Sequence, residues 1–411
     1  MRILFLTQII PYPPDAGPRV KTWHVLRYLV GRGHEVTLAS FVRAEEMPHV
    51  AELERLGLTV HTVPINRSRP ADVGYWLRSH WTRRPFLVER DDLPGMRYLV
   101  QDLLKVGEFD AVHADQLTMA QFALAGQGEA FTIFDAHNAV WTIWARMREN
   151  APWYLKPVYK IEENRIKRHE GMLIEQFSHT LAVIEPDKEA LLQGVAADKR
   201  TEAARRISVV PIAVDAAQLQ PIRRQPGSTN IMTLGSLHYP PNADGIRWFL
   251  NEVFPLVRAQ IPEATLTVIG KNPPDDFIQM AERNPDAIAV TGYVPDLTPY
   301  MEAARLMVVP VRAGGGMRVR LLEAFARAMP AVTTTVGLEG IEAAHGREVL
   351  VADDPDSFAA DTVRLLHDEA LQQHLAENGR RLAETRYDWQ IVLKQMDAVY
   401  NLVGEGVLDA E

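Results

Sequence analysis

Residues 305–332 read RLMVVPVRAGGGMRVRLLEAFARAMPAV, and this stretch decides the fold. Its first part, Leu306–Val311, is a continuous apolar run of the kind that forms a strand buried on both faces of a parallel sheet. A glycine loop, Ala313–Gly316, follows the run, and from Arg318 to Met329 the apolar residues recur at helical spacing. The stretch therefore predicts one strand–loop–helix unit of a parallel α/β sheet.

The loop and the start of the following helix carry groups suited to binding phosphate. Glycine lets the backbone approach a ligand, and a helix N-terminus offers unpaired N–H groups and partial positive charge. Arg318 and Arg320 fall in the first turn, where a bound anion would offset the unfavourable placement of a cation. Glu323 is better placed to accept hydrogen bonds from ribose hydroxyls. The alternative is an ordinary βα turn with a surface pair of Arg320 and Glu323.

The second half of the chain repeats this unit. Runs that predict strands lie at 231–234, 265–269, 288–290, 306–309, 331–334 and 349–351. Gly235 and Ser236 follow the first run, where their amides would meet the same diphosphate or form a plain turn. Asn242 is interpreted as the N-cap of a helix over 243–258. Backbone around Tyr293 and Val294 follows the third run and is a candidate to pair with a nucleobase, with a plain loop as the alternative.

The predicted diphosphate-binding residues are thus Gly235, Ser236, Gly314, Gly315, Gly316, Arg318 and Arg320. Glu323 is the predicted ribose ligand, and Tyr293 and Val294 are the predicted nucleobase contacts.

The first half shows the same alternation of strand and helix patterns. Its strand runs lie at 3–7, 35–40, 60–64, 111–113, 132–135 and 180–183, and a helical pattern covers 20–32. We predict an α/β fold of two doubly wound, Rossmann-like lobes, with the active site in the cleft between them at the carboxyl ends of the strands. The predicted parts are an N-terminal lobe (1–217), a linker (218–229), a C-terminal lobe (230–385) and a helix packing back on the N-terminal lobe (386–411).

Composition excludes several classes of protein. The chain of 411 residues has no cysteine, so it has no disulfide, no thiolate metal site and no cysteine nucleophile. Residues 1–217 hold 27 basic and 27 acidic residues, so the rest holds 44 − 27 = 17 basic and 53 − 27 = 26 acidic residues, which is the whole net charge of −9. Neither half has the basic excess of a nucleic-acid-binding protein. No apolar run approaches ~18 residues, and no secretion signal is expected.

Two residues of the first half lie where a strand is expected to end. Gly17 belongs to the loop PYPPDAGPRV (11–20), and His137 follows the strand run ending at Asp135. His113 and Asp115 lie in the same way after another run. A histidine at this edge can donate a hydrogen bond to a sugar hydroxyl or a phosphate. A surface turn at Gly17 and a structural role for the histidines are the alternatives.

Two segments combine basic and aromatic residues: WLRSHWTRR (76–84) and WYLKPVYKIEENRIKRHE (153–170). Such segments can rest on an anionic bilayer, which would bring a lipid-linked acceptor within reach. A solvated helix face is the alternative, because glutamates dilute the charge of the second segment.

In their order, these motifs resemble those of glycosyltransferase family 4, and in particular its exopolysaccharide and cell-envelope branch. The resemblance rests on Gly235-Ser236 with Asn242-Ala243-Asp244, on Thr291–Asp296 and on Gly314–Ala324. The first half contributes PYPPDAGPRV, RGHEVTL (32–38), DAHN (135–138) and VVPIAVD (209–215). The resemblance implies the GT-B fold, a nucleoside-diphosphate-sugar donor and transfer with retention.

The resemblance also implies roles for single residues. Glu323 matches the carboxylate that binds the donor ribose, and Arg318 and Arg320 match basic positions near the diphosphate. His137 matches a histidine that approaches the donor sugar, and Gly17 matches a glycine lining the reaction centre. The chain departs from the family at Gly315, where a second glutamate is usual, and it lacks the basic pair usual after Gly235.

We therefore expect a retaining glycosyltransferase that moves a sugar from a nucleoside diphosphate to the hydroxyl of a glycan, a lipid-linked acceptor or a small glycoside. The alternatives are a nucleotide-sugar epimerase of the same fold and a non-catalytic nucleotide- or sugar-binding protein. Apart from the donor as co-substrate, no cofactor and no metal are expected, because no convincing D-x-D motif follows a strand. We expect a cytoplasmic protein with no nucleic-acid partner, and consider contact of the N-terminal lobe with the inner membrane face.

Overall fold

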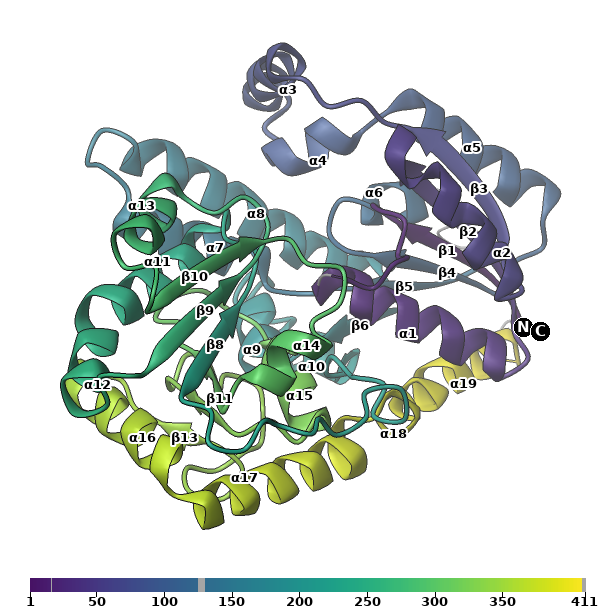
Figure 1. The fold of residues 1–411 in the computed structure, drawn as a ribbon. Helices are drawn as coiled ribbons and strands as arrows, with labels where there is room; N and C mark the ends of the chain where they lie inside the picture. Colours follow the sequence, from purple (N-terminus) through teal and green to yellow (C-terminus); the bar gives the residue numbers. More distant parts are fainter. Residues whose placement is uncertain (16, 125–129, 409–411) are drawn as a thin grey trace. The chain divides into compact units, whose positions relative to one another are not determined.

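The computed structural model describes residues 1–15, 17–124 and 130–408. The chain forms two compact units, each built on one parallel sheet flanked by helices (Figure 1). Unit 1 contains Met1–Ile212 and Val392–Glu411, and unit 2 contains Ala213–Ile391.

Unit 1 has a seven-stranded sheet in the order β3-β2-β1-β4-β5-β6-β7, and all its neighbouring strands run parallel. The strands are β1 (Arg2–Thr7), β2 (Glu35–Val42), β3 (Thr59–Pro64), β4 (Ala111–Asp115), β5 (Phe131–Asp135), β6 (His179–Ala182) and β7 (Ile207–Val209). The central strands β1 and β4 are almost wholly buried, as their continuous apolar sequences predict.

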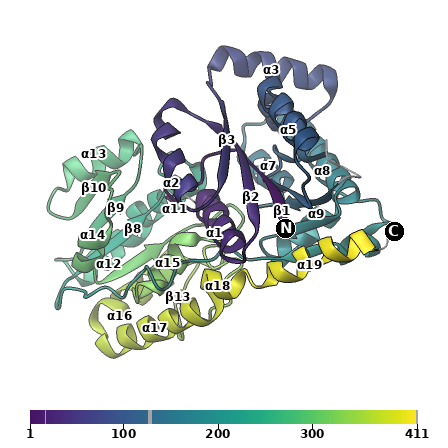
Figure 2. The same cartoon turned by 90° about the vertical axis from the view of Figure 1, so that its right-hand side faces the viewer.

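The helices of unit 1 cover both faces of this sheet (Figure 2). They are α1 (Gly17–Gly31), η1 (Ala44–His49), α2 (Val50–Arg55), α3 (Arg69–Thr82), α4 (Phe86–Asp91), α5 (Pro94–Val106), α6 (Ala120–Ala123), α7 (Val140–Asn150), α8 (Lys156–Gln176), α9 (Glu185–Leu192), α10 (Arg200–Arg205) and α19 (Gln395–Leu408). The predicted segment 386–411 thus ends in a helix of unit 1, and its last three residues lie outside the described part.

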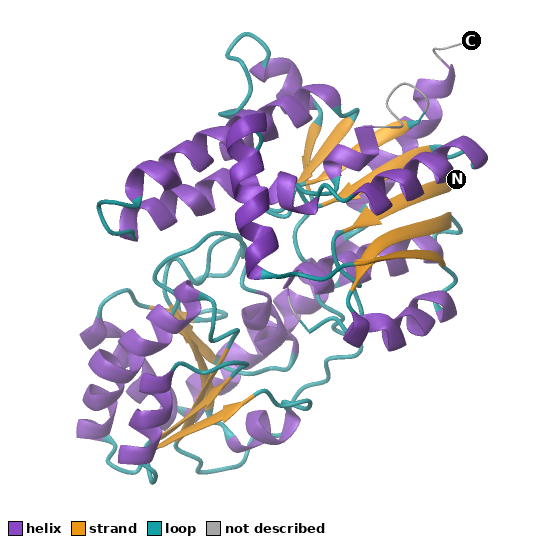
Figure 3. Ribbon diagram, turned by 90° about the horizontal axis from the view of Figure 1, so that it is seen from above, coloured by secondary structure: helices purple, strands orange, loops and turns teal. Residues whose placement is uncertain are grey.

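Unit 2 has a six-stranded parallel sheet in the order β10-β9-β8-β11-β12-β13. Its strands are β8 (Asn230–Leu234), β9 (Thr265–Ile269), β10 (Ile288–Gly292), β11 (Leu306–Val309), β12 (Ala331–Thr333) and β13 (Leu350–Val351). Helices flank this sheet too (Figure 3). They are α11 (Pro240–Trp248), η3 (Phe249–Val253), α12 (Phe254–Gln260), α13 (Asp275–Arg283), α14 (Thr298–Ala303), α15 (Val319–Ala326), α16 (Pro355–His367), α17 (Glu369–Leu382), η4 (Ala383–Tyr387) and α18 (Trp389–Val392), which crosses the unit boundary.

Both sheets have the doubly wound order, so the predicted fold class is confirmed. The strand order reverses between β1 and β4 in unit 1 and between β8 and β11 in unit 2. At such a reversal the loops leaving the two neighbouring strands diverge, and ligands of doubly wound sheets bind in the crevice this opens. The fold therefore directs attention to the residues that follow β8 and β11, and to those that follow β1 and β4.

Two helix starts differ from the prediction. The helix α1 begins at Gly17 rather than residue 20, and α11 begins at Pro240 rather than residue 243. Proline suits the first turn of a helix because its missing N–H would have no partner there. Tyr239 is consequently the N-cap residue of α11, and the interpretation of Asn242 as the N-cap is wrong.

No helix in the described ranges is long and apolar enough to cross a membrane.

Candidate functional site: the carboxyl edges of the two sheets

Three glycines line the carboxyl edge of unit 2, one on each of three neighbouring strands. Gly235 follows β8, Gly270 follows β9 and Gly292 ends β10. The Gly270 N–H donates to the carbonyl of Gly292 at 2.9 Å, and a Cβ added at Gly270 would lie 1.9 Å from the carbonyl oxygen of Gly235. The backbones of these strand ends therefore pack directly against one another. Because the glycines have no side chains, a ligand can approach this edge closely.

Arg320, on α15, lies directly against Gly235. Its guanidinium donates to the carbonyl of Leu234 and to the side-chain oxygen of Asn242, both at 2.8 Å. A Cβ added at Gly235 would lie 2.3 Å from Nη1 of Arg320, so this contact requires glycine. Burial, with Arg318 nearby, lowers the pKa of Arg320 to about 10, which still leaves it a cation at neutral pH. The structure therefore fixes a positive charge at the switch point of the sheet.

The glycine loop between β11 and α15 lies beside the start of α11. Gly314 and Gly316 have φ angles of +102° and +82°, which glycine adopts without strain. A Cβ at Gly314 would touch the Pro241 ring at 3.4 Å. Arg318 donates to the carbonyls of Gly315 and Gly316 at 2.6 and 2.7 Å, so its side chain folds back over the loop. The structure thus brings the predicted loop, both arginines and Gly235 together.

Glu323 follows Arg320 by one turn of α15 and is half-buried. Its carboxylate forms no hydrogen bond and no ion pair with any residue in the described ranges, although Arg320 and Arg327 lie close enough to attract it. Burial raises the pKa of Glu323. A half-buried carboxylate with free lone pairs can accept hydrogen bonds from a ligand.

The remaining predicted residues of unit 2 lie further along the same edge. Ser236 is exposed next to Gly235, and its carbonyl accepts from the Asn242 side chain at 3.2 Å. Tyr293 and Val294 follow β10, which is separated from β8 by β9. Tyr293 is exposed, and Nζ of Lys271 lies 4.3 Å from its ring centre. Tyr293 therefore marks the far end of the glycine edge that starts at Gly235.

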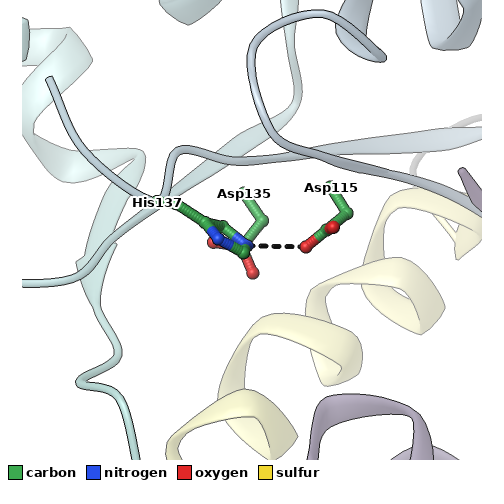
Figure 4. A group of neighbouring side chains, drawn as sticks. All are labelled: Asp115, Asp135 and His137. Carbon is green, nitrogen blue, oxygen red and sulfur yellow. Dashed lines mark hydrogen bonds and ion pairs between the residues drawn. The ribbon is translucent and has the colours of Figure 1, made fainter. Parts of the chain in front are cut away.

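In unit 1, His137 forms a close pair with Asp115 at the end of β4 (Figure 4). Nε2 of His137 lies 2.6 Å from Oδ1 of Asp115, and a carboxylate only accepts, so Nε2 carries the proton. The other carboxylate oxygen accepts from Thr7 at 2.8 Å and from Thr22 at 3.0 Å. Nδ1 of His137 has no hydrogen-bond partner among the described residues. Asp115 therefore fixes the ring, and Nδ1 remains available to a ligand.

A second buried carboxylate, Asp135, lies beside this pair at the end of β5. It forms an ion pair with Lys21 of α1, and Nε2 of His113 lies 3.6 Å from its other oxygen. Burial opposes its ionisation, but Lys21 and the imidazoles of His113 and His137 hold the pKa of Asp135 below its ordinary value. His113 in turn bonds the Tyr400 hydroxyl of α19 at 2.9 Å. These contacts assign His113 a structural role.

The segment that carries His137 is held at its far end by two more buried carboxylates. Glu170 of α8 accepts from the backbone N–H groups of Val140 and Trp141, the first residues of α7, at 2.7 and 3.3 Å. Asp187 of α9 accepts from the Ala139 N–H at 3.2 Å. Burial raises the pKa of Glu170 to about 8. The loop between Asp135 and α7 is thus fixed from both sides.

Gly17, the other predicted residue of unit 1, is the first residue of α1. It makes no contact with His137 that the structure describes, but the same helix supplies Lys21 and Thr22 to the network around Asp135 and Asp115. Gly17 therefore lies at the start of the element that completes the His137 environment.

The sequence did not point to Gly270, Lys21 or Glu170 as site residues; it indicated Asp115 only as a residue after a strand run and Asn242 only as a helix N-cap. For Gly270 and Asp115 a signal existed, since each directly follows or ends a strand. Asn242 and Lys21 lie within helices. A single sequence does not show which residue, far along the chain, a side chain on such a helix contacts.

Asp115, Asp135 and His137 offer three ligand atoms within 4.8 Å of one another, as a metal ion would require. The present contacts do not suit a cation, because the Lys21 ammonium already neutralises Asp135 and the His137 proton points at Asp115. A divalent ion would have to displace the Lys21 ammonium and the Nε2 proton of His137.

Comparisons with known proteins identify relatives of part of the chain. Residues 228–368, all within unit 2, match the family Glycosyl transferases group 1. A 165-residue stretch is 26% identical to an uncharacterized 44.6 kDa protein in the cps region of Klebsiella pneumoniae, covering 39% of this chain and 42% of that protein. A 159-residue stretch is 23% identical to the capsular polysaccharide biosynthesis glycosyltransferase CapM of Staphylococcus aureus, covering 37% and 41%. The matches thus span about two fifths of each relative.

Solved structures match over nearly the whole chain. HepE from Anabaena, in complex with UDP-glucose, has a TM-score of 0.68 at 15% identity, covering 98% of this chain and 99% of that one. Sucrose-phosphate synthase from Thermosynechococcus elongatus has a TM-score of 0.70 at 16% identity, with the same coverage. WaaG, a glycosyltransferase involved in lipopolysaccharide biosynthesis, has a TM-score of 0.66 at 16% identity, covering 96% and 99%. The chain thus has the GT-B fold of two Rossmann-like units, and residues 228–368 of the second unit match the group 1 family.

Proposed function

Starting from a GT-B fold whose second unit carries a group 1 glycosyl transferase domain, we propose that this protein transfers a glycosyl group from a nucleoside diphosphate sugar to an acceptor hydroxyl. The observation that carries the proposal is the placement of Arg320 against Gly235, beside a glycine loop at the switch point of unit 2. A fixed cation among backbone amides is what a diphosphate leaving group needs, because charge develops on it as the glycosidic bond breaks.

In this proposal each part of the unit 2 edge contacts one part of the donor. The amides of Gly235, Ser236 and Gly314–Gly316, with Arg318 and Arg320, bind the diphosphate. Glu323 accepts from the ribose hydroxyls, and the backbone at Tyr293 and Val294 contacts the base. The two guanidinium groups supply the charge that the absent basic pair after Gly235 supplies elsewhere in the family. We take a uridine nucleotide as the first candidate, since HepE is similar in fold and its structure holds UDP-glucose.

For the reaction itself we propose retention of configuration. The acceptor oxygen bonds to C1 of the donor sugar as the bond from C1 to the phosphate oxygen breaks. The proton of the acceptor passes to the departing phosphate on the same face, so no side chain has to act as a base. His137 hydrogen-bonds the donor sugar through Nδ1, with Asp115 holding its ring, and Gly17 lines the reaction centre.

We further propose that transfer needs no metal ion. Arg318 and Arg320 supply positive charge where many transferases use a divalent cation, and the cluster around Asp135 is occupied by Lys21. The acceptor we propose is a glycan, a lipid-linked sugar or a small glycoside, reached from the cytoplasmic side, with unit 1 in contact with the inner membrane face. Relatives from capsule regions support polysaccharide biosynthesis as the setting.

Thermal unfolding in the presence of UDP, GDP, ADP, CMP and NAD tests the donor site. A nucleotide at about 100 times its Kd stabilises the native state by about 2.7 kcal/mol. We expect one diphosphate to raise the Tm of the full chain, and Glu323→Ala to remove that rise. Release of an isomerised sugar without acceptor would favour an epimerase, and binding without any turnover would favour a binding protein. No response to any nucleotide would refute the proposed donor site.

A further inference from the structure

Helix α3 of unit 1 turns an apolar face toward solvent. Val73, Trp76, Leu77 and Trp81 are spaced so that they share one side of the helix, and we call them the α3 stripe. Their exposed fractions are 58%, 41%, 59% and 91%. Ser79, on the opposite side, is buried. The usual arrangement of a surface helix is therefore reversed.

The fold gives α3 little to pack on. Among the described elements its main neighbour is α4, the short helix that follows it (Figure 1). The Phe86 N–H at the start of α4 donates to Glu162 of α8, which anchors the C-terminal end of α3 to the body of unit 1. Ser68 caps the N-terminal end by accepting from the Ala71 N–H. The helix is thus capped at its N-terminal end and anchored to α8 beyond its C-terminal end, while its stripe stays uncovered.

Arginines surround the stripe. Helix α3 with its flanking residues, 67–84, contains five arginines and one acidic residue, a net charge of 5 − 1 = +4 in a chain whose total is −9. Glu89 and Asp92 are buried and engage Arg78 and Arg84. Arg69 and Arg83 form no hydrogen bond and no ion pair with the described residues. Their charges therefore remain available to an external anion.

From this face we propose that α3 docks unit 1 onto an anionic lipid bilayer. The helix lies in the plane of the interface, with the α3 stripe at the boundary of headgroups and acyl chains and Arg69 and Arg83 among the headgroup phosphates. Tryptophan favours this boundary because its ring is apolar while its N–H finds a polar partner there. With 14 residues α3 is shorter than the ~20 that a spanning helix needs, so it lies on the membrane surface.

The same chain offers a matched control. Trp153 and Tyr154, before α8, are also exposed aromatic residues of unit 1, at 82% and 61%. The segment 140–176 around them has seven basic and five acidic residues, a net charge of only 7 − 5 = +2. Charge complementarity therefore selects α3 over this second segment.

Co-sedimentation of the full chain with vesicles tests the proposal. We expect binding to vesicles of phosphatidylcholine mixed with phosphatidylglycerol and much weaker binding to phosphatidylcholine alone. Replacing Trp76 and Trp81 by serine should lower the partition coefficient by at least about tenfold. Arg69→Gln with Arg83→Gln should lower it by about 25-fold, at about fivefold for each charge, and added salt should mimic that change.

Trp153→Ser with Tyr154→Ser should leave binding at the wild-type level. All these side chains are exposed, so an unchanged Tm will show that each variant is folded. Any of three results would overturn the proposal. They are absence of binding to anionic vesicles, equal binding to both vesicle types, and an equal loss of binding in the Trp153 and Tyr154 variant. Lipid-free self-association that the stripe variant abolishes would also overturn it. None of these outcomes depends on nucleotide binding by unit 2.

Discussion

Nε2 of His137 lies 2.6 Å from Oδ1 of Asp115, and both side chains are buried at the carboxyl edge of unit 1. The carboxylate fixes the tautomer and the orientation of the ring, as partners of functional histidines generally do. We expect Asp115→Asn to lower kcat by about 10- to 100-fold with a smaller effect on the donor KM.

A control separates this positioning role from a structural one. Thr22→Val removes another hydrogen bond to Asp115 without touching His137. If both variants lose kcat in proportion to their loss of Tm, Asp115 is only a structural residue. A kcat loss confined to Asp115→Asn and His137→Ala supports the positioning role.

Gly235→Ala should act through Arg320. The new Cβ would lie 2.3 Å from Nη1, so the guanidinium must leave the Leu234 carbonyl. We expect a loss of about 1–3 kcal/mol in the free energy of unfolding and at least about tenfold weaker nucleotide binding. Gly31→Ala, where nothing lies within 4 Å, is the matched control.

The double variant Gly235→Ala/Arg320→Ala tests the mechanism. Removing the guanidinium relieves the clash, so the stability losses of the two single variants should not add. Additive losses measured by urea unfolding would contradict a direct contact between these residues.

Glu323→Gln should separate stability from binding. Burial raises the pKa of Glu323, so the folded protein holds its proton more tightly than the unfolded chain does, and its ionisation costs stability as the pH rises. We expect the uncharged variant to have an equal or higher Tm at pH 7 without nucleotide, and a smaller nucleotide-induced rise. A lower Tm with an unchanged rise would show that Glu323 is a structural residue.

Much of the fold follows from the sequence because a buried parallel strand needs a continuous apolar run, and such runs followed by helical patterns imply crossovers. The loop from Ala313 to Gly316 could be predicted for the same reason, because the strand and the helix that it joins adjoin it in the sequence. The contact of Asn242 could not be predicted, because its partner Arg320 lies 78 residues away and the contact exists only once β8 and β11 become neighbours. The Lys21–Asp135 pair, 114 residues apart, depends on strand order in the same way.

The reversed helix α3 shows a different limit. Its apolar spacing is that of an ordinary core-facing helix, and only the structure shows that the side bearing Trp81 is exposed. Periodicity reports that a helix has two faces, but it does not say which face is covered.

Glu170 predicts a pH dependence of stability. Its pKa, about 8 in the folded protein, lies above the ordinary value of 4.5, so the folded state binds the proton more tightly than the unfolded chain. Its contribution to stability is therefore complete below about pH 4.5 and is lost as the pH rises to about 8, by roughly 1.4 kcal/mol per pH unit at most. Glu170→Gln should flatten the fall in Tm across this range. If the Tm values of the wild type and the variant change in parallel from pH 5 to pH 8, this role of Glu170 is contradicted.

Metal independence can be tested with the help of Lys21. We expect EDTA to leave the transferase activity unchanged and Mn²⁺ to leave the wild-type Tm unchanged. Lys21→Met removes the cation that neutralises Asp135 and leaves a buried charge unpaired, which should cost about 3–5 kcal/mol. Asp115, Asp135 and His137 then present three ligand atoms with no competing ammonium, so Mn²⁺ should restore part of the lost Tm in this variant alone. Mn²⁺ stabilisation or EDTA inhibition of the wild-type protein would instead show that a metal ion binds despite Lys21. The proposal that the arginines are the only cations at the diphosphate would then be wrong.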